Sequence, residues 1–217
     1  ATRSNLPSDK SLIGFVGGPW TLFTYAVEGA HKGSLQTAKS QMTLFQEFSN
    51  WMVPFLKQNI ELQLSGGAEV VMVLDTAAGE LDPWMFQRHL APGLIELSKA
   101  FPKSLGYYSK GTHQVHLESL LEHSQFGGFG VDHRFVMSQV LKSAGGQGFR
   151  QGNFDQALLF LDPAEFEAVL QNYLQPLVEL SPAQRKGWVC GVGHGVLQKT
   201  PEDNVKRFVD RVRESFV

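Results

Sequence analysis

Five consecutive apolar residues at 70–74, Val-Val-Met-Val-Leu, limit the possible folds of this chain more than any other feature. The run has no polar face, and polar Asp75 and Thr76 follow it at once. A strand that is apolar on both sides is typical of a parallel sheet covered on both faces. Parallel strands need long crossovers between them, which are usually helical. The run therefore predicts an α/β fold in which strands and helices alternate.

The rest of the chain supports this alternation, with about six strand–helix units. Further strands are predicted at residues 12–18, 105–109, 126–131, 149–151 and 187–192, and helices at 19–27, 36–63, 115–123 and 135–143, with others opening at Asp82-Pro83, Asp162-Pro163 and Thr200-Pro201. Pro54 and Pro92 fall inside helical patterns and predict a kink or break there. No Pro-, Gly- or Ser-rich linker is evident, so residues 1–217 are expected to form a single domain.

Six units leave two architectures open. A closed barrel requires eight units. A doubly wound open sheet can have six, but it usually carries a glycine-rich phosphate loop after its first strand. Residues 14–18 do not fit that loop. The chain is either an open sheet without a nucleotide site or a barrel that lacks two units.

Composition excludes several classes of function. The net charge of −2 argues against nucleic-acid and membrane-surface partners, and no apolar run is long enough to span a bilayer. Cys190 is the single cysteine, so no intrachain disulfide can form, and a reducing, cytoplasmic location is expected. Cys190 has no metal-ligand companion at the usual spacing, so no metal site is predicted. Because the chain opens on Ala1 and a polar stretch, it is expected to be processed or a fragment.

Residues 14–29 (GFVGGPWTLFTYAVEG) form a second informative stretch. A strand that meets two glycines and a proline and then becomes a helix makes a concave backbone corner. Its large aromatics are Phe15, Trp20, Phe23 and Tyr25. Such a corner could hold a flat ligand, or it could be a buried turn lined by core aromatics.

Ligands of parallel α/β folds bind beyond the carboxyl ends of the strands. By period-two alternation, Thr76 shares a face with Leu74, while Asp75 faces the helices. His194 stands between two glycines, where it could donate to an anion or be satisfied by the backbone. Other strand-end candidates are Lys110, Asp132, His133, Arg150, Gln151 and Asn153.

Taken together, these stretches resemble the uroporphyrinogen decarboxylase family. The resemblance rests on residues 14–29, LDTAAGELDP at 74–83, KGT at 110–112, GVD at 130–132, QGNFD at 151–155, VGHGV at 192–196 and TPEDNVKRFVDRVRE at 200–214. It covers the chain from about residue 12 to the end and matches the C-terminal two-thirds of the family. It implies a (β/α)8 TIM barrel, usually a homodimer, of which the six units would be strands three to eight.

The resemblance also implies an activity in porphyrin and heme biosynthesis. Family enzymes remove the four acetate carboxyl groups of uroporphyrinogen III to give coproporphyrinogen III, without a metal or organic cofactor. Protonation of a pyrrole carbon makes a ring cation that serves as the electron sink for loss of CO2. The protein must bind an octacarboxylate, stabilise the cation and deliver protons.

The resemblance assigns roles to eight residues. Tyr25 would hydrogen-bond a substrate carboxylate or the catalytic carboxylate, and Thr76 and His194 would contact substrate carboxylates. Phe15 and Leu74 would pack on the macrocycle. Weaker matches, for charge and for ordering the strand ends, are Lys110, Gln151 and Asn153.

The chain departs from the family in one respect. The family's Arg-rich motif and its catalytic Asp lie in an N-terminal region with no counterpart here, and Arg150 and Lys110 are the obvious cations at strand ends. The chain is therefore expected to be a fragment that is inactive alone and that self-associates through exposed sheet edges. Two alternatives are a cobamide-dependent methyltransferase of the same superfamily, with a zinc site, and a non-catalytic tetrapyrrole-binding paralogue.

Overall fold

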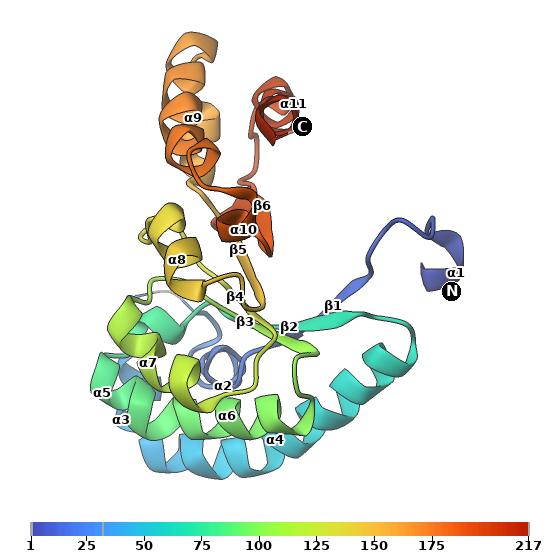
Figure 1. The fold of residues 1–217 in the computed structure, drawn as a ribbon. Coiled ribbons are helices and arrows are strands. Elements are labelled where there is room, and N and C mark those ends of the chain that lie inside the picture. Colours follow the sequence, from blue (N-terminus) through green and yellow to red (C-terminus); the bar gives the residue numbers. More distant parts are fainter. Residues whose placement is uncertain (1, 32, 217) are drawn as a thin grey trace. The chain divides into compact units, whose positions relative to one another are not determined.

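A computed structural model describes residues 2–31 and 33–216, which form six strands with helices between them (Figure 1). The chain divides into two compact units, 1–129 and 130–217, and each is described by itself. The expectation of a single domain stays a prediction. No helix in the described part of the chain is long and apolar enough to cross a membrane.

The first unit alternates strands and helices as the sequence predicts. Its elements are α1 (Thr2–Asn5), β1 (Ile13–Gly17), α2 (Pro19–Glu28), α3 (Gln36–Ser40), α4 (Met42–Ser65), β2 (Val70–Asp75), the 3-10 helix η1 (Ala78–Glu80), α5 (Pro83–Met85), the π-helix η2 (Phe86–Leu90), α6 (Ala91–Ala100), β3 (Leu105–Ser109) and α7 (Gln114–His123). Strand β4 (Gly128–Gly130) lies at the boundary between the units.

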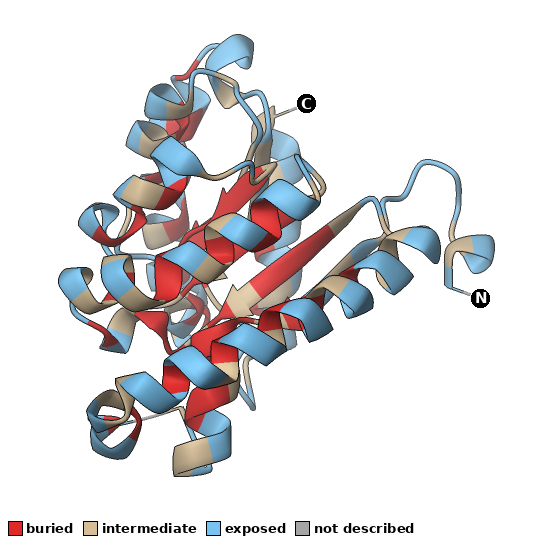
Figure 2. Ribbon diagram, turned by 90° about the horizontal axis from the view of Figure 1, so that it is seen from below, coloured by how far each residue is buried: buried red, intermediate tan, exposed pale blue. Residues whose placement is uncertain are grey.

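Strand β2 is the apolar run that first indicated the fold, and it lies between β1 and β3. Both pairings are parallel. Val71 and Val73 are fully buried and Met72 nearly so. Figure 2 shows the same pattern, with buried residues along the strands and on the inward faces of the helices. The predicted α/β fold with parallel strands is confirmed.

The predictions made at the two prolines inside helical patterns have different outcomes. The pattern at 36–63 breaks at Gln41, whose φ of −118° and ψ of 44° are not helical, and α4 continues through Pro54. Pro54 and Asn50, whose carbonyl loses its donor, are both exposed, so water can satisfy that carbonyl. The break predicted at Pro54 is therefore wrong, and the alternative of a kink stays a prediction. At Pro92 the interruption is confirmed, because a π-helix ends at Leu90 and α6 begins with Pro92 in its first turn.

The second unit holds the remaining strands and helices. Its elements are α8 (Met137–Ala144), β5 (Phe149–Phe154), the 3-10 helix η3 (Gln156–Phe160), α9 (Pro163–Val178), α10 (Pro182–Arg185), β6 (Trp188–Val192) and α11 (Glu202–Phe216). Strands β5 and β6 pair in parallel. One core packs Phe154 of β5 against Phe166 of α9 and Phe208 of α11. A second core packs Val131 against Met137 and Leu177.

Two strands differ in length from their predictions. β4 spans three residues rather than 126–131, and β5 spans six rather than 149–151. The extension of β5 through a Gly-Asn pair gave no apolar pattern to predict it. Its consequence is that Arg150 lies at the start of β5 and donates to the carbonyls of Gln147 and Phe149. Its placement at a carboxyl end was therefore wrong.

Candidate functional site

In the first unit, two expected macrocycle contacts share one face of the sheet. Phe15 pairs with Met72, and Gly17 pairs with Leu74. Directly paired residues point to the same side, and this side is opposite to that of buried Val16. Phe15 is 67% exposed although it is a large aromatic. The sheet therefore presents Phe15 and Leu74 on the face that does not carry the helix-covered core.

The glycine corner after β1 is a tight backbone contact. The Gly18 N–H donates to the Leu74 carbonyl at 2.7 Å. A Cβ on Gly18 would lie 2.3 Å from Cγ of Asp75, so only glycine fits. Asp75 Oδ1 accepts from the backbone N–H and the hydroxyl of Thr21, at 2.8 and 2.6 Å. Asp75 thus holds the first turn of α2, and it faces the helices as alternation predicts.

The aromatics of the corner divide into two groups. Trp20 and Phe23 are buried and pack against Phe45, with Trp20 and Phe45 edge to face at 5.1 Å between ring centroids. Phe15 and Tyr25 are exposed. The interpretation of all four as one ligand-binding corner is therefore wrong for Trp20 and Phe23, which are core residues.

Tyr25 has a polar neighbour that sequence reasoning missed. Its hydroxyl is hydrogen-bonded to Nδ1 of His31, and the two rings lie 5.1 Å apart. Gly29, at a left-handed φ of 69°, ends α2 between them and lets the chain turn back. A Gly that ends a helix, with His two residues later, is the sequence signal that could have identified the pair. The other candidates of this unit, Thr76 and Lys110, are half-buried and directly follow β2 and β3.

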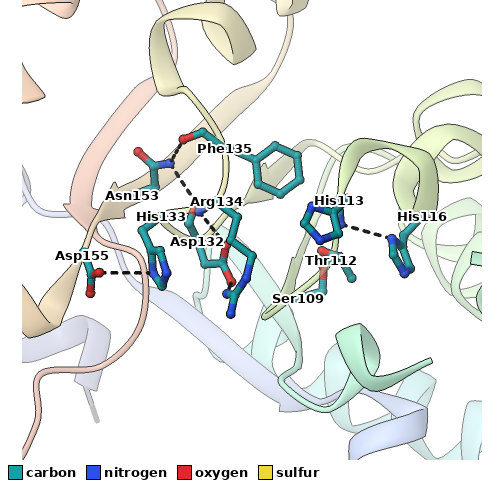
Figure 3. Close-up of polar contacts among 10 residues, drawn as sticks. All are labelled: Ser109, Thr112, His113, His116, Asp132, His133, Arg134, Phe135, Asn153 and Asp155. Carbon is teal, nitrogen blue, oxygen red and sulfur yellow. Dashed lines mark hydrogen bonds and ion pairs between the residues drawn. The ribbon is translucent and has the colours of Figure 1, made fainter. Parts of the chain in front are cut away.

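The paired histidines after β3 have a structural role (Figure 3). Nδ1 of His116 accepts from the His113 N–H at 3.1 Å, so the ring proton sits on Nε2 and donates to the Leu81 carbonyl at 3.1 Å. His116 is buried at the start of α7. Both of its nitrogens are used in capping the helix and in tethering it to the loop that holds Leu81.

In the second unit, the ends of β5 and β6 meet the loop after β4. Asn153, which is 3% exposed, donates from its amide nitrogen to the carbonyls of Asp132 and Phe135, at 2.8 and 2.6 Å. A Cβ on Gly193 would lie 2.9 Å from the His133 nitrogen. His194 follows Gly193 directly and is half-buried. Asn153 therefore ties β5 to the loop after β4, and Gly193 brings the backbone of the next residue, His194, close to this loop.

The loop after β4 carries two donors with carboxylates nearby, of which only Arg134 is within hydrogen-bond distance of its carboxylate (Figure 3). Nδ1 of His133 lies 3.8 Å from Oδ2 of Asp155. Nη1 of Arg134 lies 2.6 Å from Oδ2 of Asp132, whose side chain is 2% exposed. Sequence reasoning named Asp132 and His133 as strand-end residues but missed Arg134. An arginine two residues after a strand-end aspartate is the signal that was available.

Gln151 lies on the sheet face of the second unit that is turned away from the helices. Phe154 packs in the core against α9, so by alternation Gln151 points the other way, beside its partner Val189. A cavity of about 260 Å³ also lies in this unit, between the start of α8, the end of β5 and α9. Apolar residues such as Leu158 and Val169 line much of it.

Comparisons with known proteins agree on the family. The family model described as uroporphyrinogen decarboxylase (URO-D) matches residues 1–215. A uroporphyrinogen decarboxylase from Helicobacter hepaticus is 30% identical over 229 residues, and one from Christiangramia forsetii is 26% identical over 221 residues. Each alignment covers 98% of this chain and 62% of the relative. The chain thus spans about three-fifths of the length of these relatives.

Solved structures show a similar fold at low sequence identity. The match to a methyltransferase from Methanosarcina mazei covers 99% of this chain and 62% of the methyltransferase chain, with a TM-score of 0.63 and 17% sequence identity. A second match is to a putative vitamin-B12 independent methionine synthase from Listeria monocytogenes. It covers 96% of this chain and 64% of the synthase chain, with a TM-score of 0.60 and 13% sequence identity. At these identities the likeness shows the fold alone, and it agrees with the expected TIM-barrel type.

Proposed function

The chain belongs to the uroporphyrinogen decarboxylase family, and from this we propose that it serves the removal of the four acetate carboxyl groups of uroporphyrinogen III, giving coproporphyrinogen III for porphyrin and heme biosynthesis. The observation that carries the proposal is the family match over residues 1–215. The exposure of Phe15 supports it, because a 67% exposed phenylalanine on a strand is suited to pack against a flat macrocycle.

The proposed contacts follow from the chemistry of the substrate. Phe15 and Leu74 would cover part of a tetrapyrrole face. Tyr25 would donate its hydroxyl proton to a carboxylate while accepting from a protonated Nδ1 of His31, and Thr76 and His194 would also donate to carboxylates. Lys110 and Gln151 are secondary candidates: Lys110 for its charge, and Gln151 for the sheet face on which it lies. Asn153 would act through the strand ends, because its amide hydrogens already bind backbone carbonyls.

The reaction itself separates into binding and proton delivery. Protonation of the ring carbon next to the one that bears the acetate group gives a ring cation, and the electrons of the breaking C–CO2 bond neutralise that cation and form an exocyclic methylene. A second proton converts this methylene into a methyl group, and the ring carbon that took up the first proton releases it to restore the aromatic pyrrole, so each acetate exchanges CO2 for one proton. The residues assigned above bind and orient carboxylates, whereas none of them is assigned the stabilisation of the cation.

Binding and turnover can be tested separately. Titration of the purified protein with uroporphyrin, followed by porphyrin fluorescence, measures binding, and anaerobic incubation with uroporphyrinogen followed by chromatography measures turnover. His194→Gln should weaken uroporphyrin binding about tenfold, because a charge-assisted hydrogen bond is lost. His123→Gln is the matched control, because His123 is exposed at the end of α7. No uroporphyrin binding by the wild-type chain would refute the proposal.

The proposal also covers the oligomeric state, the location and the activity of the 217 residues. We propose a cytoplasmic homodimer that acts without a cofactor, and we expect the 217 residues to lack turnover and to self-associate when purified alone. Sedimentation at high concentration that gives a clean monomer would contradict the self-association, and measurable turnover would contradict the inactivity.

The methyltransferase alternative has the fold likeness alone in its favour, and stoichiometric zinc would revive it. Uroporphyrin binding without turnover by a full-length form would favour the tetrapyrrole-binding paralogue.

A further inference from the structure

We propose that Arg134 binds a carboxylate group of the substrate, with Asp132 as the residue that positions its guanidinium. The inference rests on the proposed function, because it assigns a further ligand for the same anionic substrate. It starts from a short contact: Nη1 of Arg134 lies 2.6 Å from Oδ2 of Asp132, and the Arg134 backbone N–H donates to Oδ1 at 3.0 Å. The two contacts hold the first residues of the loop after β4 in one geometry.

This pair lies directly beyond the carboxyl end of β4, which ends at Gly130. Val131 packs in the core with Met137 and Leu177, so its side chain points toward the helices. Asp132 is the next residue, already outside the strand, and its side chain is buried. The guanidinium bound to Asp132 therefore lies at a strand end of the kind beyond which parallel α/β folds bind ligands.

Burial differs sharply between the two partners. The Asp132 side chain is 2% exposed, whereas that of Arg134 is 39% exposed. A guanidinium has five N–H donors in a rigid fork, and the contact with Asp132 uses one of them. The buried carboxylate thus fixes an arginine whose outer edge still reaches solvent. A fork held in this way loses little conformational entropy when it binds a second carboxylate.

The neighbouring residues extend the same donor surface. His133 is 36% exposed at its side chain, and Asp155 lies 3.8 Å from its Nδ1. Gly193 packs against the His133 backbone, and His194 follows it. In Figure 3 the side chains of His133 and Arg134 both extend from the loop after β4. An arginine next to His133 in the same loop is suited to a polycarboxylate, which a chain with a net charge of −2 would otherwise attract poorly.

The test compares uroporphyrin affinities of the wild type and variants by fluorescence titration at low and high salt. Arg134→Gln should bind uroporphyrin about tenfold more weakly at low salt, because charge-assisted hydrogen bonds are lost. Arg134→Lys should fall between the two, because it keeps the charge without the fork. The difference between wild type and Arg134→Gln should shrink in high salt, where ionic contacts are screened. Arg207→Gln is the matched control, because Arg207 pairs with Glu167 on the helix surface at 2.8 Å.

Two results distinguish this assignment from a purely structural ion pair. If Arg134→Gln does not fold because it leaves Asp132 uncompensated, Asp132→Asn/Arg134→Gln removes both charges and should fold while still binding uroporphyrin about tenfold more weakly. An arginine that only neutralised Asp132 would leave the affinity of that double variant within about twofold of wild type, which would overturn the assignment. If the wild type itself bound no uroporphyrin, the proposed function would fail and the assignment with it.

Discussion

Replacement of Asp75 by Asn tests whether the buried carboxylate of Asp75, which ends β2 and bonds to the first turn of α2, lowers the free energy of unfolding at neutral pH. Asp75 is fully buried, and its Oδ1 accepts two hydrogen bonds from Thr21. Its Oδ2 has no hydrogen-bond partner within the described residues. Burial raises the pKa of Asp75 from 3.8 to about 6, although the hydrogen bonds from Thr21 act in the opposite direction. Asn keeps the shape and the accepting oxygen but cannot ionise.

The expected magnitude follows from the two pKa values. The folded state binds the proton more tightly than the unfolded state, so stability from this group is fully present below the unfolded pKa of 3.8 and is lost as pH rises to about 6. The whole loss is about 3 kcal/mol, at 1.36 kcal/mol for each pKa unit. Between about pH 4.5 and 8, the free energy of unfolding should fall by about 2 kcal/mol more in the wild type than in Asp75→Asn.

Urea denaturation of both proteins at the two pH values, followed by circular dichroism, measures this difference of differences. The cost of burying the extra amide N–H of the introduced asparagine is the same at both pH values, so it cancels. Asp9→Asn is the matched control, because Asp9 is exposed, and its profile should run parallel to that of the wild type. A pH-dependent difference below about 0.5 kcal/mol for Asp75→Asn would refute the assignment of an ionised, poorly solvated Asp75.

Three further substitutions separate structural from substrate-binding residues. Gly18→Ala should lower the free energy of unfolding by about 1–3 kcal/mol, because its Cβ would overlap Asp75. Gly195→Ala is the control and should be tolerated, because no atom lies within 4 Å of the added Cβ. Chemical denaturation compares the two variants. Asn153→Ala should cost about 2–3 kcal/mol in the same assay, because a buried and a partly buried carbonyl lose their donor, and an unchanged midpoint would contradict this role. Phe15→Ala should leave the free energy of unfolding within about 0.5 kcal/mol of wild type, because the ring is exposed, but should weaken uroporphyrin binding in the fluorescence titration. Equal binding by both proteins would remove Phe15 from the site.

Much of the fold could be predicted where a single local pattern dominated. The run at 70–74 predicted β2 and the parallel sheet, because burial on both sides requires apolar residues at every position. Strand β5 could not be bounded in this way, because its second half, Gly152 to Phe154, is held by contacts with β6 and with Tyr173. Pro54 misled the prediction because the cost of a helical proline depends on whether water reaches the carbonyl it leaves unpaired.

The amino-acid sequence by itself determined the alternation of strands and helices and which polar residues directly follow the predicted strands. It did so because strand alternation and strand ends are local properties of the chain. Only the tertiary structure decided which side chains are buried in the core or bonded to other parts of the chain. It placed Trp20 and Phe23 in the core, bonded Asp75 to Thr21 of α2 and paired Arg134 with buried Asp132. These outcomes depend on contacts between residues distant in sequence or on burial, and no local pattern records them.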